Sequence, residues 1–422
     1  MAKTPSSVPV YGEKPAAVTG LLGDFRLLLI LFIAFRVLLL LVYQPLLVEG
    51  GERGITVGGD YQTYFNIASL SDSLGAPFRD WWSEFPPVWT YLSVLIYQGT
   101  GGGYAGYGLL LGLAVLAFDV GNLALVRNIG AHLYGAATGP ALAWIYALLL
   151  APLVFTFWTF EPLAAFWLLL GLWWLLKKRD ARSALAAAAG ALTKLTPALL
   201  VGAVWRFREG RSAARYTALL AGAFALVYLP LLAQNAAMTL PSLTAQFNKA
   251  SYQTVWALVD GNYRTGNFGP LADRADPTRA TVMQGYPAVV PGWLRLGAAL
   301  ALGVFVFARA RRFDDRGLVA FVTLTLLIFF LQAQGWSPQW LAQIAPLVLL
   351  CFPTRSGVLI VVLLSAAVFV EYPFLFIRTG DTGGEITGAL VGPFVTLVLA
   401  RTILLAGVCV ALYRKLRQEP AG

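Results

Sequence analysis

The sequence predicts an all-α polytopic membrane protein, and three observations support this fold class: its composition, its apolar runs and the positions of its basic residues. Of its 422 residues, 58% are hydrophobic and 12% are charged, and the mean hydropathy is +0.69. Soluble domains carry about 25% charged and about 45–50% apolar residues, and disordered chains are less apolar still. Apolar runs recur along the whole chain, for example at 27–42, 219–233 and 358–370. Because about 20 such residues cross a hydrocarbon layer, we expect many membrane spans.

The basic residues predict the orientation of these spans rather than a nucleic-acid partner. The 31 Lys and Arg exceed the 21 Asp and Glu, which gives a formal charge of +10. They gather in short clusters between apolar runs, at 177–179, 206–215, 309–316 and 414–417. This is the distribution that the positive-inside rule describes. The basic residues do not alternate with aromatic residues on one face, so we expect no nucleic-acid binding. We therefore place the clusters and both termini in the cytoplasm.

Cysteine and histidine are too few to predict a metal centre. Cys351 and Cys409 lie far apart in apolar runs, and His132 is the single histidine. This pattern indicates neither a disulfide framework nor a zinc site. We expect no cofactor, although two acids of the first outer loop, Asp60 and Glu84, could still hold a metal ion.

The apolar segments follow one another in an order that predicts about twelve spans. The spans are expected at 27–47, 107–126, 139–157, 163–176, 183–194, 197–205, 217–233, 288–308, 317–333, 338–351, 357–375 and 391–412. The stretch 88–98 is too short to span and is expected to lie in the interface as a juxtamembrane helix. Residues 48–106 and 234–287 then form two large extracytoplasmic loops, and 1–422 is one transmembrane domain. We expect the chemistry in these loops.

Two acids stand out in the first outer loop. Asp60 follows two glycines and precedes an amphipathic stretch, 61–70, so it is expected to cap that helix. Backbone hydrogen bonds and the helix dipole would then keep Asp60 ionised. Glu84 precedes a double proline that stiffens the chain before the interfacial helix. The plainer interpretation makes Asp60 only a cap and Glu84 a solvated loop charge.

Two further acids lie at or within the spans. Glu161 stands at the outer end of the third span, between aromatic residues at interfacial depth, and it is either functional or an exposed helix-start acid. Asp119 lies well inside the second span, where a carboxylate needs a partner or a task. With Asn122 three residues later, we expect Asp119 to hold helices together.

Lys194 is the basic residue whose position is most informative. The spans 183–194 and 197–205 lie between two cytoplasmic clusters, so they form a short hairpin that cannot cross the membrane fully. Lys194 is then at the tip, beside a helix that begins at Pro197. A lysine next to a helix N-terminus forms an anion site, and a lipid phosphate is the anion available at that depth. The alternative is a lysine that snorkels to the interface.

Two later segments carry polar and aromatic residues at the outer face. In the second outer loop, Tyr263 and Arg264 follow a turn rich in Gly and Asn, which suits sugar stacking or phosphate binding. It equally suits a well-ordered loop. Gln339 lies between two tryptophans, Trp336 and Trp340, which are alternatively interfacial anchors.

Four motifs in order resemble the C-type fold of membrane glycosyltransferases. They are Gly59-Asp60-Tyr61-Gln62-Thr63-Tyr64, Glu84-Phe85-Pro86-Pro87, Lys194-Leu195-Thr196-Pro197 and Ser337-Pro338-Gln339-Trp340. More narrowly, the chain resembles the polyprenol-phosphate-mannose-dependent mannosyltransferases of glycosyltransferase family 87. The likeness extends over nearly the whole chain. At the position of Glu161 that family more often has Asp, which leaves the role of Glu161 open.

The resemblance implies transfer of a sugar, mannose in this family, from a polyprenyl-phosphate donor to an acceptor hydroxyl. The transfer would proceed by inversion in one displacement, with Asp60 as general base. Glu84 and Glu161 would orient hydroxyl groups, and Lys194 and Arg264 would stabilise charge on the donor phosphate. The residues expected to contact substrate are Tyr61, Tyr64, Tyr263 and Gln339. No metal is needed for such a donor, and the partners are the lipid-linked sugar, a glycan, glycolipid or protein acceptor, and membrane lipid.

Three other classes of protein stay open on the sequence alone. A lipid or glycan transporter or flippase would explain the spans, although we find no internal repeat of the kind transporters carry. A polymerase of lipid-linked glycans would share an outer active site, and a non-catalytic subunit would keep only the fold. Arginine far outnumbers lysine and alanine is abundant, which favours a prokaryotic plasma membrane with the active site facing outside.

Overall fold

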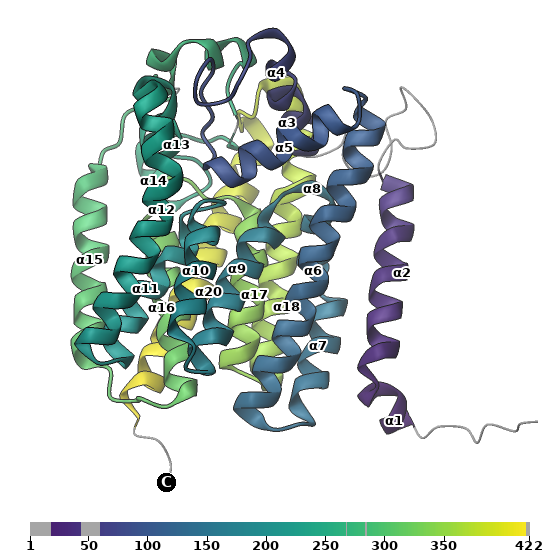
Figure 1. Ribbon diagram of the computed structural model, residues 1–422, viewed down its shortest axis with the longest axis vertical. Helices are drawn as coiled ribbons and strands as arrows, with labels where there is room; N and C mark the ends of the chain where they lie inside the picture. Colours follow the sequence, from purple (N-terminus) through teal and green to yellow (C-terminus); the bar gives the residue numbers. More distant parts are fainter. Residues whose placement is uncertain (1–17, 44–59, 267, 283–284, 419–422) are drawn as a thin grey trace, which may run out of the picture.

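The computed structural model describes residues 18–43, 60–266, 268–282 and 285–418 (Figure 1). Within these ranges the chain is helical and forms no β-strand, so the all-α prediction is confirmed. Residues 48–59 of the predicted first loop lie outside the described part. The α-helices are α1 (Val18–Gly23), α2 (Phe25–Tyr43), α3 (Asp60–Ala68), α4 (Leu70–Ser73), α5 (Pro87–Gly99), α6 (Tyr104–Tyr134), α7 (Thr138–Leu148), α8 (Leu150–Trp158), α9 (Glu161–Leu176), α10 (Asp180–Ala191), α11 (Leu200–Phe207), α12 (Gly210–Thr239), α13 (Pro241–Asn248), α14 (Val255–Asp260), α15 (Gly292–Arg309), α16 (Asp315–Gln332), α17 (Leu341–Cys351), α18 (Arg355–Phe369), α19 (Phe376–Arg378) and α20 (Val391–Arg417). Shorter turns are η1 (Thr196–Leu199), η2 (Leu271–Ala275), η3 (Pro277–Thr281), η4 (Pro338–Trp340), the π-helical η5 (Val370–Leu375), η6 (Gly380–Thr382) and η7 (Gly388–Leu390).

Seven helical segments of the described chain are long and apolar enough to cross a membrane. They are Phe25–Val42, Tyr104–Tyr134, Gly210–Asn248, Gly292–Arg309, Asp315–Gln332, Arg355–Arg378 and Gly388–Arg417. The pair α7 and α8 makes an eighth if it is one span, bent by 58° at its break. These helices support a multi-pass membrane protein.

The predicted total of about twelve spans is not confirmed by length and composition. Helix α9 and the unit η4–α17 are apolar but shorter than a full span. Helix α10 has 12 residues, which at about 1.5 Å per residue reach only about 18 Å of a layer about 30 Å thick. The predicted hairpin that does not cross fully is therefore present as α10, η1 and α11.

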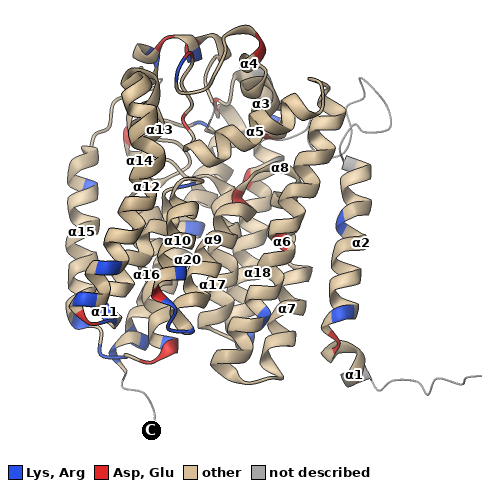
Figure 2. Cartoon of the chain, viewed as in Figure 1, with Lys and Arg blue, Asp and Glu red and all other residues tan. Residues whose placement is uncertain are grey.

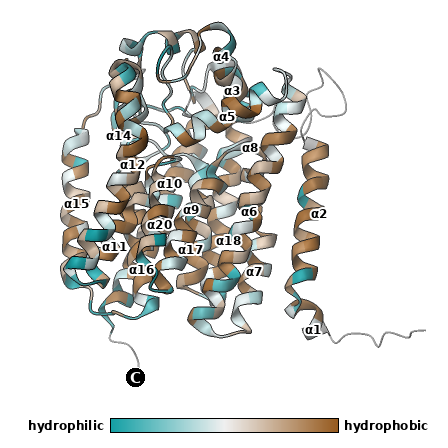
Figure 3. Cartoon of the chain, viewed as in Figure 1, coloured by the Kyte–Doolittle hydropathy of each residue, from teal (hydrophilic) through white to brown (hydrophobic). Residues whose placement is uncertain are grey.

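The short helices of the two predicted loops gather at one end of the bundle. Figure 1 shows α3, α4, α5, α13 and α14 at the end opposite the C-terminus, and α5 lies across the bundle. Helix α5 is the predicted interfacial segment, and its N-terminal proline suits the first turn of a helix. Figure 3 shows strongly hydrophobic helices in the middle of the molecule and more hydrophilic residues towards both ends.

The basic clusters lie together at the other end (Figure 2). Arg206 donates to the carbonyl of Ala310 at 2.6 Å, and Arg417 donates to the carbonyl of Arg309 at 3.2 Å. These bonds join three clusters that are far apart in the sequence. The prediction that they share one side is confirmed for these three.

Asp119 holds four helices together, α2, α6, α7 and α8, and the sequence predicted such a structural role for it. Its carboxylate pairs with Arg36 of α2 at 2.9 Å and accepts bonds from Tyr146 at 2.6 Å and Thr156 at 2.9 Å. Asn122 donates to the carbonyl of Pro162 at 2.9 Å. Because an unpaired charge within a membrane is costly, this network fixes α2 and the α7–α8 pair against α6.

Candidate functional site

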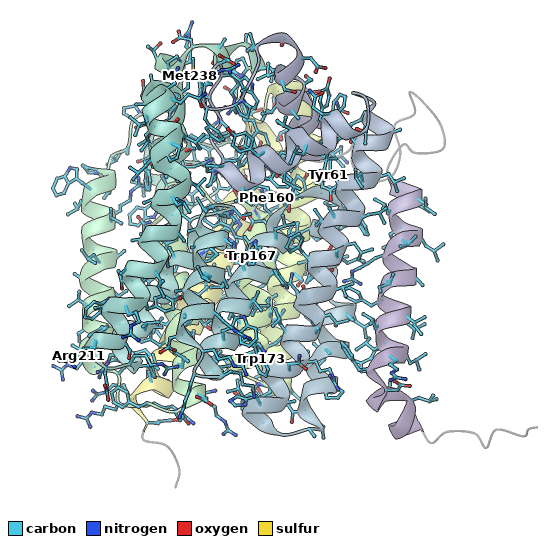
Figure 4. The ribbon with its side chains drawn as sticks, in the orientation of Figure 1. Tyr61, Phe160, Trp167, Trp173, Arg211 and Met238 are labelled. Atoms are coloured by element: carbon cyan, nitrogen blue, oxygen red, sulfur yellow. The ribbon has the colours of Figure 1, made fainter. Side chains whose placement is uncertain are left out.

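One large cavity lies where the short helices of the predicted loops meet the bundle. Its volume is about 450 Å³. Six of the predicted site residues line it: Asp60, Tyr64, Glu84, Glu161, Lys194 and Gln339. Figure 4 places Tyr61 and Phe160 towards the end that holds α3 and α5 and Arg211 near the end of the basic clusters, and Phe160 is part of the cavity wall. The structure thus brings together residues that are separated by up to 279 positions in the sequence.

Asp60 begins α3 and faces the cavity because the rest of that helix is anchored by aromatic residues. Tyr64 is buried and packs against Trp89 with ring centroids 4.8 Å apart. The Tyr64 hydroxyl donates to Oδ2 of Asp60 at 3.2 Å, and Gln339 donates to the same oxygen at 3.4 Å. Burial holds the pKa of Tyr64 well above its usual value, so this hydroxyl remains a donor.

The pKa of Asp60 is raised to about 7. Burial is the largest cause, and the negative charges of Glu161 and Glu84 add to it, while the Tyr64 hydrogen bond and Lys194 oppose it. The expectation that helix capping keeps Asp60 fully ionised is therefore wrong. A carboxyl group with a pKa near neutrality exchanges a proton readily, which suits a general acid or base.

Glu161 and Lys194 form an ion pair on the cavity wall. Glu161 is buried at the start of α9, and Gln343 donates to its other oxygen at 2.8 Å. The hydroxyl of Thr196 donates to Gln343 at 2.8 Å, which ties the hairpin tip to α17. The interpretation of Glu161 as an exposed helix-start acid is therefore wrong.

Glu84 is also buried and is held by basic partners that the sequence did not reveal. It forms ion pairs with Lys249 and, at 2.8 Å, with Arg274. Burial alone would raise the pKa of Glu84, but the charges of Lys249 and Arg274 outweigh it and lower the pKa below its usual value. Glu84 is thus an ionised and fixed carboxylate rather than a solvated loop charge.

Three predicted residues lie elsewhere. The hydroxyl of Tyr61 is buried and donates to the carbonyl of Thr156 at 2.7 Å. Tyr263 packs against Phe394 with centroids 6.2 Å apart. Arg264 lines a smaller neighbouring cavity of about 70 Å³, which also includes Glu84 and Lys249.

Several cavity residues were not among the predicted site residues. Lys249, Gln253, Arg295 and Gln334 line the cavity from loops or helix ends. For Arg295 a signal was present, because a basic residue at the predicted outer end of a span departs from the positive-inside rule. Gln253 and Gln334 begin the two polar and aromatic segments that precede Tyr263 and Gln339, whereas for Lys249 the neighbouring sequence offers no pattern.

The described residues contain no group of three or more His, Cys, Asp or Glu side chains placed to hold a metal ion. Two of the three cavity acids, Glu84 and Glu161, are bonded to basic or amide groups instead.

Comparison with known proteins adds distant likenesses only. No family model matches the chain, and no curated protein matches its sequence. The solved structures that match include the Archaeoglobus fulgidus oligosaccharyltransferase tethered with an acceptor peptide, with 12% identity, a TM-score of 0.39 and coverage of 93% of this chain and 56% of that chain. Another is the archaeal oligosaccharyltransferase AglB from the same organism with an inhibitory peptide and a dolichol-phosphate, with 13% identity, a TM-score of 0.35 and coverage of 93% and 56%. The chain spans little more than half the length of these proteins, and likeness at this level does not establish a shared function.

Proposed function

We propose that this protein is a glycosyltransferase of the C-type fold that transfers a hexosyl group, mannose by its sequence resemblance, from a polyprenyl-phosphate donor to an acceptor hydroxyl. The observation that carries the proposal is the position of Asp60. It is a carboxyl group with a pKa of about 7 in a cavity of about 450 Å³ that is shared with two fixed ion pairs. General-base catalysis needs a carboxylate of this kind within reach of a hydroxyl.

The reaction is an inverting displacement. The carboxylate of Asp60 removes the proton from the acceptor hydroxyl as its oxygen bonds to the anomeric carbon of the sugar. The bond from that carbon to the phosphate oxygen breaks, and the electron pair leaves with the lipid phosphate. Phosphate monoesters are stable as anions, so the leaving group needs no proton.

The remaining cavity residues have supporting roles in this scheme. Glu84 and Glu161 accept hydrogen bonds from sugar hydroxyls, and their ion pairs with Lys249 and Lys194 hold the two carboxylates in place. Lys194 also reduces the charge that develops on the phosphate, and the role of Arg264 in phosphate binding stays a prediction from its motif. Tyr64 and Gln339 hold the Asp60 carboxylate in position. The roles of Tyr61 and Tyr263 in substrate binding likewise stay predictions.

The proposed orientation places the cavity on the extracytoplasmic side. The basic clusters lie at the opposite end of the bundle from α3 and α5 (Figure 2), and basic loops stay in the cytoplasm by the positive-inside rule. The proposed topology has about twelve segments, of which the α10–α11 hairpin does not cross fully. The proposed location is a prokaryotic plasma membrane, with no metal required.

The test uses the full chain in lipid nanodiscs with a polyprenyl-phosphate-mannose donor and a panel of glycan, glycolipid and peptide acceptors. We expect transfer by the wild type and a loss of about 100-fold or more in Asp60→Asn, since the base is removed. Asp72→Asn is the matched control, because Asp72 is an exposed acid of α4 outside the cavity. Undiminished transfer by Asp60→Asn would eliminate this base. Absence of transfer by the wild type with every acceptor, together with lipid movement across the bilayer, would favour a flippase.

A further inference from the structure

The charged side chains of the main cavity do not all have partners. The cavity is lined by Asp60, Glu84, Glu161, Lys194, Lys249 and Arg295. Lys194 pairs with Glu161, and Lys249 pairs with Glu84. Within the described residues, Asp60 and Arg295 are the two cavity charges that form no ion pair. Asp60 is assigned a chemical task above, and Arg295 has none.

Arg295 is buried and forms no direct ion pair among the described residues, although the carboxylate of Asp260 is close enough to act on it. Its exposed fraction is 4%, although it lies in the first turn of α15. One terminal nitrogen donates to the side-chain oxygen of Gln334 at 3.3 Å, and the guanidinium lies 5.5 Å from the ring centre of Trp256. Its Nε and Nη1 have no acceptor in the described part of the chain. Burial of an unpaired cation is unfavourable unless a ligand supplies the missing charge.

The surroundings of Arg295 open onto an apolar surface of the protein. Phe247, Trp293 and Leu296 line the cavity and yet are 59%, 75% and 49% exposed, so they form its apolar mouth between α13 and α15. Only 11% of the residues of α15 are buried inside the protein, and Figure 1 shows this helix at the edge of the bundle. A buried cation behind an apolar opening matches an anionic head group on a long apolar chain.

We propose that Arg295 binds the phosphate of a polyprenyl-phosphate lipid that enters the cavity sideways between α13 and α15. Guanidinium groups donate several hydrogen bonds to phosphate oxygens and remain charged at all relevant pH values. The proposal rests on the proposed function for the identity of the lipid, whereas the need of Arg295 for an anion follows from its burial. Lys194 already has Glu161 as its counter-ion, so Arg295 is the principal cation for the phosphate.

The experiment measures binding of sugar-free polyprenyl phosphate to the full chain in nanodiscs. We expect Arg295→Gln to weaken binding about 10-fold to 100-fold, because charge-assisted hydrogen bonds to the phosphate are lost, and Arg295→Lys to weaken it less. Arg309→Gln is the matched control, since Arg309 is an exposed arginine at the other end of the same helix. Equal binding by wild type and Arg295→Gln would overturn the proposal.

Two further probes identify the ligand. Polyprenol, which lacks the phosphate, should bind at least about 10-fold more weakly to the wild type, and this difference should vanish in Arg295→Gln. Inorganic phosphate at millimolar concentration should not displace the lipid, because the apolar chain contributes to affinity. Displacement by inorganic phosphate, with no preference for the lipid, would overturn lateral entry of a lipid and leave a site for free anions.

A purely structural arginine would behave differently in the absence of lipid. Under the proposal, Arg295→Gln removes an unpaired buried charge, so the midpoint of thermal unfolding should stay the same or rise, while stabilisation by polyprenyl phosphate is lost. A fall of that midpoint in the lipid-free variant would assign Arg295 to the fold instead.

The outcome is separable from that of the proposed function. Asp60→Asn should bind polyprenyl phosphate as the wild type does, because Asp60 acts on the acceptor. Phosphate binding through Arg295 without any sugar transfer would refute the transferase and keep this inference. Sugar transfer by the wild type together with unchanged lipid binding in Arg295→Gln would keep the transferase and refute this inference.

Discussion

At the scale of single residues, the protonation of Asp60 determines how activity should depend on pH. With a pKa of about 7, the carboxylate is the minor form in acid and the major form in base. We expect kcat/KM to rise about tenfold per pH unit below that value and to level off above it. Glu84 adds no step in this range, because its pKa is lowered. A pH–rate profile from pH 5.5 to 8.5 measures the midpoint.

The hydrogen bond from Tyr64 allows that midpoint to be moved. This bond lowers the pKa of Asp60, so Tyr64→Phe should shift the midpoint to higher pH. Tyr107→Phe is the matched control, because the buried Tyr107 hydroxyl bonds to Ser93 at 2.6 Å and not to Asp60. A profile that does not move in Tyr64→Phe would show that another group governs it.

Substitution of Glu84 is expected to change the stability of the fold, because Glu84 is the counter-ion of the buried Arg274. Glu84→Gln leaves that guanidinium without a counter-ion, and removal of one partner of a buried pair costs about 3–5 kcal/mol. We therefore expect a clearly lower midpoint of thermal unfolding. Asp80→Asn, which removes the surface pair with Arg79, should lower that midpoint much less, because exposed ion pairs contribute little to stability. Similar effects of the two substitutions would contradict this assignment.

At the scale of elements, the hairpin that carries Lys194 depends on close packing at Gly190. A Cβ atom at Gly190 would lie 2.6 Å from Cβ of Pro197 and 2.8 Å from Cβ of Trp167, so at least one of these segments would have to shift. We expect Gly190→Ala to destabilise the protein by about 1–3 kcal/mol and to reduce transfer, because η1 moves with Lys194. Gly202→Ala in α11 meets nothing within 4 Å and should be neutral or slightly stabilising. Thermal unfolding and transfer assays of the two variants measure the difference.

The helices themselves were largely predictable, since runs of apolar residues indicate them directly. All twelve predicted segments contain helix within the described residues, and 88–98 forms α5. The break between α7 and α8 was missed. Pro152 explains it, because a proline removes one backbone donor and clashes with the carbonyl four residues earlier. The sequence contained that proline, but apolar content alone suggested one continuous span.

At the scale of the whole molecule, the site combines residues with strong local patterns and residues with none. Asp60, Glu84 and Lys194 could be found because each lies beside glycine or proline residues that predict a turn or a helix start. Lys249 and Arg295 could not be assigned as readily, since the role of each depends on whether the folded chain places an acid next to it to form an ion pair. Pairing of this kind depends on the tertiary fold, so the sequence identified candidate acids but not the charge balance of the cavity.

The orientation of the whole molecule gives the last prediction. The cavity lies at the end of the bundle that holds α3 and α5, whereas the basic clusters lie at the opposite end (Figures 2 and 4). We expect Asp72→Cys in α4 to react with a membrane-impermeant thiol reagent in intact cells, and Arg211→Cys, an exposed position in a basic cluster, to react only after permeabilisation. Cys351 is buried and Cys409 lies within α20, so the wild type should give little background in either case. If the labelling pattern were reversed, the cavity would face the cytoplasm, and the donor would have to be presented from the inner leaflet.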